Sequence, residues 1–231
     1  MKKVLVSITS LEGTDWEKQI EDLRKFKISE FALFVSALEK KAREKLYAKL
    51  DKIVKQAAIP FVHARSDMAV SEFDYLRRRW QTKKFNLHPR RDFAWNLDYS
   101  SLSDWIYIEN SGKGNDSLSG EDLVGCAGVC LDTAHFENSR RLYPAVYQKV
   151  VTTLERYPVG ANHISAITKK HYDKFSQTER YDGHIMTDLA ELDYLKNLPS
   201  QYFGEYMAIE LANDIATQLK AKKYIENIVR E

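Results

Sequence analysis

The chain has 231 residues, of which 44% are hydrophobic and 29% are charged, and its formal net charge at pH 7 is +2. This length fits one barrel domain or two small domains, and the apolar content is sufficient for one large core. A charge so close to neutral excludes a protein that attracts nucleic acid through its overall charge, so any site for a polyanion must be local.

Apolar, β-branched runs alternate with amphipathic segments along the whole chain. The runs predict eight strands, at residues 3–9, 30–35, 59–64, 84–88, 105–109, 127–132, 159–164 and 205–211. Apolar residues at helical spacing predict helices at 39–57, 71–82, 139–156, 187–198 and 214–229. The residues that follow Thr14 and Ser36 fit a capping box at the start of a helix. The segments 89–104 and 110–126 leave room for one or two helical turns at most.

This alternation predicts an α/β fold, a compact (β/α)₈ TIM barrel with short or missing helices after the fourth and fifth strands. We expect a single domain over residues 1–231, because no internal repeat and no low-complexity linker indicates a second one. A doubly wound open sheet is the alternative. It would not bring side chains from six different strands into one place.

Two further features concern the environment of the protein. Cys126 and Cys130 lie on one apolar run, where they point the same way but are too far apart to form a disulfide, which favours free thiols in a cytoplasmic protein. The start, MKKVLVSITS, is too weakly apolar for a signal sequence, and no window approaches the roughly 18 apolar residues of a membrane span. We expect a soluble, cytoplasmic monomer without a membrane partner.

Nine side chains of the kinds that bind metal ions lie at the ends of the predicted strands or shortly after them. Those at the strand ends recur roughly every 20 to 30 residues, about one βα unit. The nine are His63, His88, Glu109, Asp132, His135, His163, Asp182, His184 and Glu210. A closed barrel brings all its strand ends to one face, so we expect these side chains to converge. A single histidine there would more often be an ordinary core or rim residue, and Asp132 could simply cap a helix.

The donor types indicate which ions would bind. Mixed histidine and carboxylate ligands favour Zn²⁺, Mn²⁺ or Fe²⁺ and exclude an all-oxygen Ca²⁺ site. Nine ligands with bridging carboxylates suffice for three ions. Several arginines follow these ligands closely and should lie around the same face, where guanidinium groups suit phosphate oxygens, although each could instead be a solvated loop charge. They are Arg65, Arg90, Arg91 and Arg140.

Four stretches resemble the endonuclease IV family of abasic-site endonucleases (AP endonuclease family 2), within the xylose-isomerase-like TIM barrels. They are IENSGKG around Glu109, GVCLDTAH around Asp132 and His135, HISA at His163, and YDGH at Asp182 and His184. The resemblance covers roughly residues 59–211 and implies three zinc ions. The first would be bound by His63, His88 and Glu109, the second by Glu109, Asp132, His163 and Glu210, and the third by His135, Asp182 and His184.

The resemblance implies a zinc-dependent hydrolase of DNA repair, a phosphodiesterase that cuts DNA 5′ to abasic sites by means of a metal-bridged hydroxide. Glu109 and Glu210 would be catalytic and orient the nucleophile, and DNA containing abasic sites would be the partner. The chain departs from the family in its shorter loops and in the absence of an aromatic residue from ARSDMAV after His63. The alternative is a xylose-isomerase-like sugar or sugar-phosphate isomerase or epimerase, which needs one ion and has little use for the third set of ligands.

Overall fold

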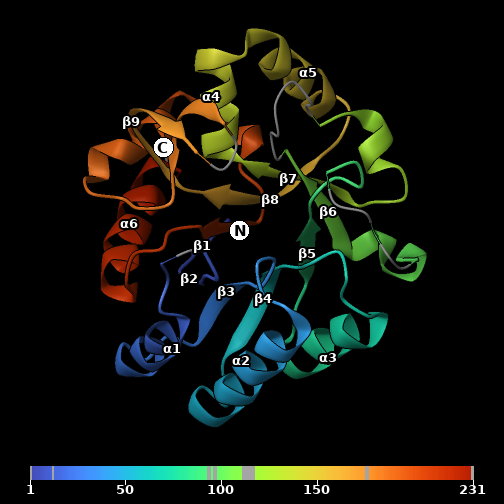
Figure 1. Cartoon of the computed structure of the whole chain (residues 1–231), viewed down its shortest axis with the longest axis vertical. Coiled ribbons are helices and arrows are strands. Elements are labelled where there is room, and N and C mark those ends of the chain that lie inside the picture. The colour runs from blue at the N-terminus through green and yellow to red at the C-terminus, as the bar shows by residue number, and fades with distance from the viewer. Residues whose placement is uncertain are drawn as a thin grey trace.

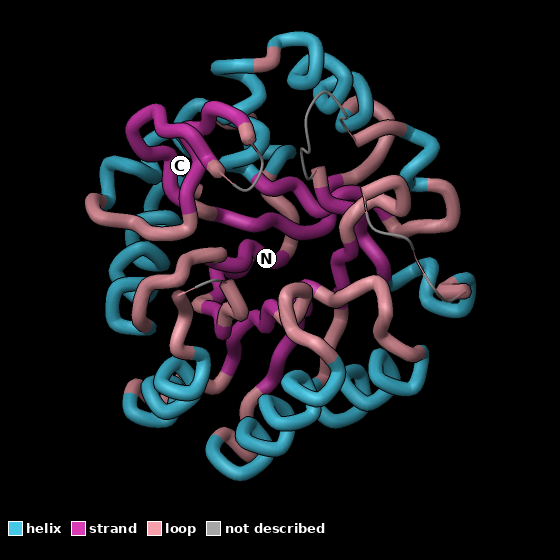
Figure 2. Tube along the Cα trace, in the orientation of Figure 1, coloured by secondary structure: helices cyan, strands magenta, loops and turns pink. Residues whose placement is uncertain are grey.

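The computed structural model describes residues 2–11, 13–92, 95, 98–110, 118–174 and 177–229. A ring of parallel strands lies at the centre of the molecule, and helices surround it (Figures 1 and 2). The strands of the ring are β1 (Lys3–Leu5), β2 (Ser7–Ile8), β3 (Glu30–Phe34), β4 (Ala58–His63), β5 (Lys84–Leu87), β6 (Ile106–Glu109), β7 (Gly128–Asp132), β8 (Val159–Ile164) and β11 (Tyr206–Ile209). This is the predicted TIM barrel.

The barrel closes through its first strand, which is divided in two. β1 pairs with β11 and β2 pairs with β3, in both cases in parallel. Between the two halves, the carbonyl oxygen of Val6 accepts a hydrogen bond from the N–H of Ala32 at 2.9 Å. The remaining strands follow in chain order around the ring. The strand predicted at residues 3–9 therefore pairs with both β3 and β11 and closes the sheet. This closure excludes an open sheet.

Helices cover the outside of the barrel. They are α1 (Trp16–Lys25), α2 (Lys40–Ile53), α3 (Val70–Trp80), α4 (Thr133–Leu142), α5 (Pro144–Leu154) and α6 (Ile215–Ile228). Four 3₁₀ helices are also present, η1 (Ser100–Trp105), η2 (Gly120–Leu123), η3 (Leu189–Asn197) and η4 (Ser200–Tyr202). The helices in the described residues between β5 and β6 and between β6 and β7 are η1 and η2, which confirms the short helices expected after the fourth and fifth strands. None of the helices in the described ranges is long and apolar enough to cross a membrane.

Three local predictions were wrong. The helix predicted at 139–156 is two helices, because Pro144 lacks a backbone N–H and is favoured in the first turn of a new helix, α5. Asp15, rather than Thr14, caps α1 by accepting a hydrogen bond from the N–H of Lys18 at 2.9 Å. Ser36 lies too early to cap α2, whose N-cap residue Glu39 makes no side-chain capping bond.

An antiparallel hairpin follows β8 where the sequence predicted only a loop. Its strands are β9 (Ala166–Asp173) and β10 (Thr178–Gly183), and it lies beside α4 (Figure 1). Only the start of β9 is buried, and its remaining side chains are half-buried or exposed. This hairpin carries Asp182, whose carboxylate lies 2.6 Å from the ring of His135 on α4.

The interior of the barrel is filled mainly by small and aromatic side chains, together with one leucine. The members of this layer are Leu5, Ala32, Phe34, Phe61, Cys130, Ala161, Tyr206 and Ala208, with Tyr107 packed against them. A Cβ atom on Gly160 would lie 1.9 Å from the ring of Tyr107, so this glycine makes room for the aromatic side chain. Cys126 and Cys130 are free thiols, as predicted.

Candidate metal centre

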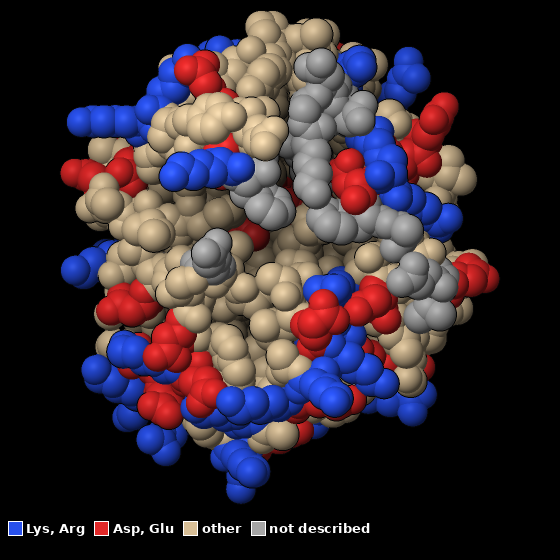
Figure 3. Space-filling view, in the orientation of Figure 1, with Lys and Arg blue, Asp and Glu red and all other residues tan. Residues whose placement is uncertain are grey.

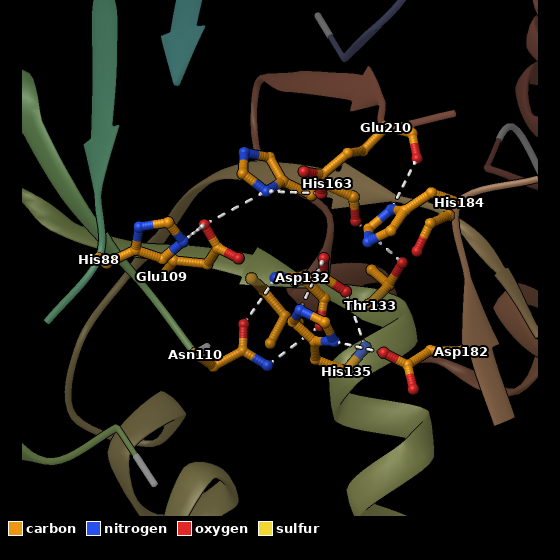
Figure 4. Close-up of polar contacts among 12 residues, drawn as sticks. His88, Glu109, Asn110, Asp132, Thr133, His135, His163, Asp182, His184 and Glu210 are labelled. Atoms are coloured by element: carbon orange, nitrogen blue, oxygen red, sulfur yellow. Dashed lines mark hydrogen bonds and ion pairs between the residues drawn. The ribbon is translucent and has the colours of Figure 1, made fainter. Parts of the chain in front are cut away.

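Six of the predicted ligands converge at the carboxyl ends of the barrel strands, and Figure 4 labels five of them, all except His63. His63, Glu109 and Asp132 are the last residues of β4, β6 and β7. His163 lies one residue before the end of β8, and the last two ligands directly follow β5 and β11. We call these six residues the inner group: His63, His88, Glu109, Asp132, His163 and Glu210. All are buried except His88, which is half-buried.

One carboxylate oxygen lies at the centre of the inner group. Glu109 Oε2 is 3.5 Å from His63 Nε2, 3.4 Å from His163 Nδ1 and 3.8 Å from His88 Nε2. His163 Nδ1 is also 3.2 Å from Glu210 Oε2. Three sets have donor atoms that all lie within 4.8 Å of one another: His63, His88 and Glu109; Glu109, Asp132 and His163; and His63, His163 and Glu210. Glu109, His63 and His163 each belong to two of these sets, and Glu109 is the one carboxylate among them.

Several donor atoms of the inner group are buried without a hydrogen-bond partner among the described residues. They are both ring nitrogens of His63, Nδ1 of His163 and Oδ2 of Asp132. A buried polar atom without a partner costs about 1–3 kcal/mol, and such atoms are rare in native proteins. Divalent ions would satisfy these atoms, so the residues present fit a metal centre.

The charges of the inner group also suit metal binding. Burial lowers the pKa of His63 to about 3, so its imidazole is neutral and has a lone pair for an ion at physiological pH. Burial would raise the pKa of Glu109, but the charge of His163 outweighs this effect and holds that pKa well below its ordinary value. Burial raises the pKa of Asp132 to about 6. A cation would stabilise the ionised form of both carboxylates.

Asp132 has two roles at the end of β7. Its Oδ1 accepts a hydrogen bond from the backbone N–H of His135 at 2.7 Å and so caps α4, which is the simple role considered from the sequence. The side chain of Asn110 fixes its backbone, accepting from the N–H of Asp132 at 2.6 Å and donating to its carbonyl oxygen at 3.0 Å. These contacts leave Asp132 Oδ2 available as a ligand.

Asn86 connects two ligands and was not singled out from the sequence. Its Nδ2 donates to Glu109 Oε2 at 3.0 Å, and its Oδ1 lies 3.1 Å from His163 Nε2. If His163 Nε2 donates in this contact, the lone pair of Nδ1 faces the other ligands. The only sequence signal was a polar residue inside the strand KFNLH, two positions before His88 and therefore on the same side of the strand.

Replacing Asn86 with Ala is expected to weaken zinc binding by roughly 10- to 100-fold, because residues that orient metal ligands contribute about that much to affinity. The measurement is competition with a chromophoric zinc chelator. Asn197→Ala is the matched control, since Asn197 is exposed on η3, and it should leave the affinity unchanged. Equal affinities for both variants would show that Asn86 does not position the ligands.

The remaining predicted ligands are arranged differently, and we call His135, Asp182 and His184 the outer group. His135 Nδ1 is 2.6 Å from Asp182 Oδ2, and His184 Nδ1 is 3.2 Å from the backbone carbonyl oxygen of Glu210. Among the residues that the structure describes, the outer group does not form a set of donors within 4.8 Å of one another. The guanidinium of Arg180 contacts both His135 and Asp182.

The four arginines predicted to bind substrate are at the surface or half-buried. Arg90 is exposed and stacks on Trp95, with its guanidinium carbon 4.3 Å from the ring centroid. The other three form ion pairs: Arg65 with Glu39 at 2.7 Å, Arg91 with Asp122 at 2.9 Å and Arg140 with Glu137 at 2.7 Å. Figure 3 shows a face that is hollowed near its centre and carries both basic and acidic side chains around the hollow. Substrate binding by these arginines stays a prediction.

Comparisons with known proteins give similarities of structure only. No family model matches the sequence, and no curated protein matches it. The chain is similar to SacUVDE (14% identity, TM-score 0.49, 99% of each chain covered) and to endonuclease IV from Thermus thermophilus (13% identity, TM-score 0.49, 97% of this chain and 99% of the other). It is also similar to the 3-keto-D-glucoside 4-epimerase YcjR from E. coli (10% identity, TM-score 0.47, 99% and 100% covered). Similarities at this level do not assign an activity.

Proposed function

We propose that the protein is a metal-dependent phosphodiesterase whose inner group binds two neighbouring divalent ions. The observation that carries this proposal is the position of Glu109, whose carboxylate belongs to two ligand sets at once. A carboxylate in this position is suited to bridge two ions. Paired ions are typical of phosphatases and nucleases, because together they stabilise the attacking and leaving oxygens of a phosphoryl transfer.

The residues of the inner group would bind the two ions from opposite sides of Glu109. His63 and His88 would hold one side of the centre, and His163, Asp132 and Glu210 the other, with Glu109 between them. When bound, divalent ions supply positive charge to a phosphate and make water an effective nucleophile at neutral pH. We propose Glu109 and Glu210 as the catalytic carboxylates that fix the position of the nucleophile.

For the substrate we propose DNA that contains abasic sites, cut on the 5′ side of the lesion, and for the metal we propose zinc, with Mn²⁺ or Fe²⁺ as substitutes. The support for this substrate is the resemblance of GVCLDTAH and YDGH to the endonuclease IV family. An abasic nucleotide also has no base to unstack, so moving it out of the duplex towards a recessed site costs little free energy. Of the four arginines we propose Arg90 for contact with a backbone phosphate, because it is exposed and stacks on Trp95, whereas the other three pair with carboxylates.

The test is cleavage of a labelled duplex with one stable abasic analogue by zinc-loaded protein. We expect one cut 5′ to the analogue, no cut in an undamaged duplex of the same sequence, and loss of activity with a chelator that returns on adding zinc. A protein that carries both ions but leaves the abasic duplex intact would contradict the proposed substrate. Cleavage that persists without metal would contradict the proposed mechanism.

A sugar or sugar-phosphate isomerase or epimerase is the second candidate. A third metal site would distinguish a three-ion nuclease from a one-ion isomerase. The ligands of that site, the outer group, contact Arg180 instead, and this favours the second candidate. Against it stands the set of His63, His88 and Glu109, which a one-ion enzyme does not need. Exchange of a substrate C–H proton with deuterated solvent, followed by NMR on a panel of sugar phosphates, would identify this activity.

A further inference from the structure

A guanidinium lies where the third ion would be expected. Arg180 Nε donates to Asp182 Oδ1 at 2.9 Å, and its Nη2 donates to the other oxygen of the same carboxylate, which makes the pair bidentate. The same Nη2 lies 3.0 Å from His135 Nδ1. Two of the three donor residues of the outer group therefore face an arginine side chain.

Arg180 is held in this position from two directions. Its Nη1 lies 3.7 Å from a carboxylate oxygen of Asp173 on the paired strand β9, and only 21% of its side chain is exposed. The β9–β10 ladder shifts register between Arg180 and Asp182, and both side chains reach His135 on α4. The arginine is thus part of the packed structure rather than a loose surface residue.

The charge of this arrangement disfavours a further cation. An arginine side chain stays protonated in proteins, so its charge cannot be removed to admit an ion. Asp182 is the only carboxylate of the outer group, and the guanidinium already occupies both of its oxygens. A divalent ion would have to displace Arg180 and would be repelled by it at short range.

We propose that the guanidinium of Arg180 takes the place of a third metal ion, so that the chain binds two ions and supplies the third positive charge of the site from a side chain. This inference rests on the metal centre proposed above. The chain would then differ from the three-ion arrangement that the resemblance of its sequence motifs implies, because it would bind two ions. Unlike an ion, the charge of Arg180 cannot be removed by a chelator.

The test is a zinc count per chain by elemental mass spectrometry, after reconstitution and removal of loosely bound metal. We expect two ions in the wild type and three in Arg180→Met, because Met removes the charge and leaves His135, Asp182 and His184 free to bind. Arg180→Lys and the control Arg141→Met should each retain two, since Lys keeps a charge and Arg141 pairs with Glu137 instead. The double variant Arg180→Met/His135→Ala should return to two.

Three ions in the wild type would overturn the inference while leaving the metal centre intact. The same holds if Arg180→Met folds and still binds two, because the guanidinium would then not be what excludes the third ion. An absence of zinc from the wild type would instead overturn the proposed metal centre and this inference with it. The wild-type count alone tests the inference if Arg180→Met fails to fold.

Discussion

Replacing Glu109 with Gln is expected to reduce cleavage of abasic DNA by about 1,000-fold or more, which corresponds to roughly 4 kcal/mol of lost transition-state stabilisation. The neutral amide cannot bridge two cations, and its NH₂ group could face the imidazoles that now surround Oε2 at 3.4–3.8 Å. The measurement is kcat/KM at saturating zinc, together with the zinc content of the variant, which should fall.

The control for this substitution is Glu205→Gln. Glu205 is exposed and pairs with Lys84 at 3.3 Å, so its loss should change activity less than twofold. Activities are compared on folded protein, because without metal Glu109→Gln should be less stable than the wild type: the lowered pKa of Glu109 shows that its charge is stabilised by His163, and the amide leaves that imidazole without this partner. A Glu109→Gln protein that keeps a tenth of the wild-type activity would exclude a bridging role.

The largest loss of stability is expected from Arg43→Ala, far from the metal centre. Arg43 is on α2, and 1% of its side chain is exposed. It forms a bidentate pair with Glu72 on α3 at 2.8 and 3.0 Å and a contact with Asp67 at 3.0 Å. Removing one partner of such a network leaves buried charge without compensation, which costs about 3 kcal/mol in the free energy of unfolding. Urea denaturation of the metal-free protein measures this loss.

Arg79→Ala provides the comparison on the same pair of helices. Arg79 pairs with Asp51 at 2.6 Å, but 31% of its side chain is exposed, so its removal should cost about 1 kcal/mol or less. Equal losses for the two variants would show that burial does not determine the strength of the Arg43 network.

The barrel was predictable because its strands are buried on both sides. Such strands are short apolar runs, and helices with one apolar face separate them, as in VCLD before α4 and YMAI before α6. The hairpin of β9 and β10 was not predictable in this way. Four consecutive side chains of β9 are exposed, at residues 169–172, so a sequence such as TKKHY resembles a polar loop rather than an alternating strand.

The inner group was predictable for a related reason. A ligand at the end of an apolar strand is conspicuous, as at Glu109 or His163, and closure of the barrel then brings the strand ends together. Asn86 and Arg180 give no such signal. An asparagine in a strand and an arginine in a hairpin are common, and their roles appear only when the partners, Glu109 for one and Asp182 for the other, are located in space.

The most direct single measurement is an anomalous difference map at the zinc edge from crystals of the zinc-loaded protein. We expect two peaks, one on each side of the Glu109 carboxylate, with His63 and His88 at the first and His163 and Asp132 at the second. We expect no peak between His135 and Asp182, where the guanidinium of Arg180 lies. Crystals without a peak at Glu109, although the protein in solution is loaded with zinc, would contradict a metal-dependent phosphodiesterase built on this residue.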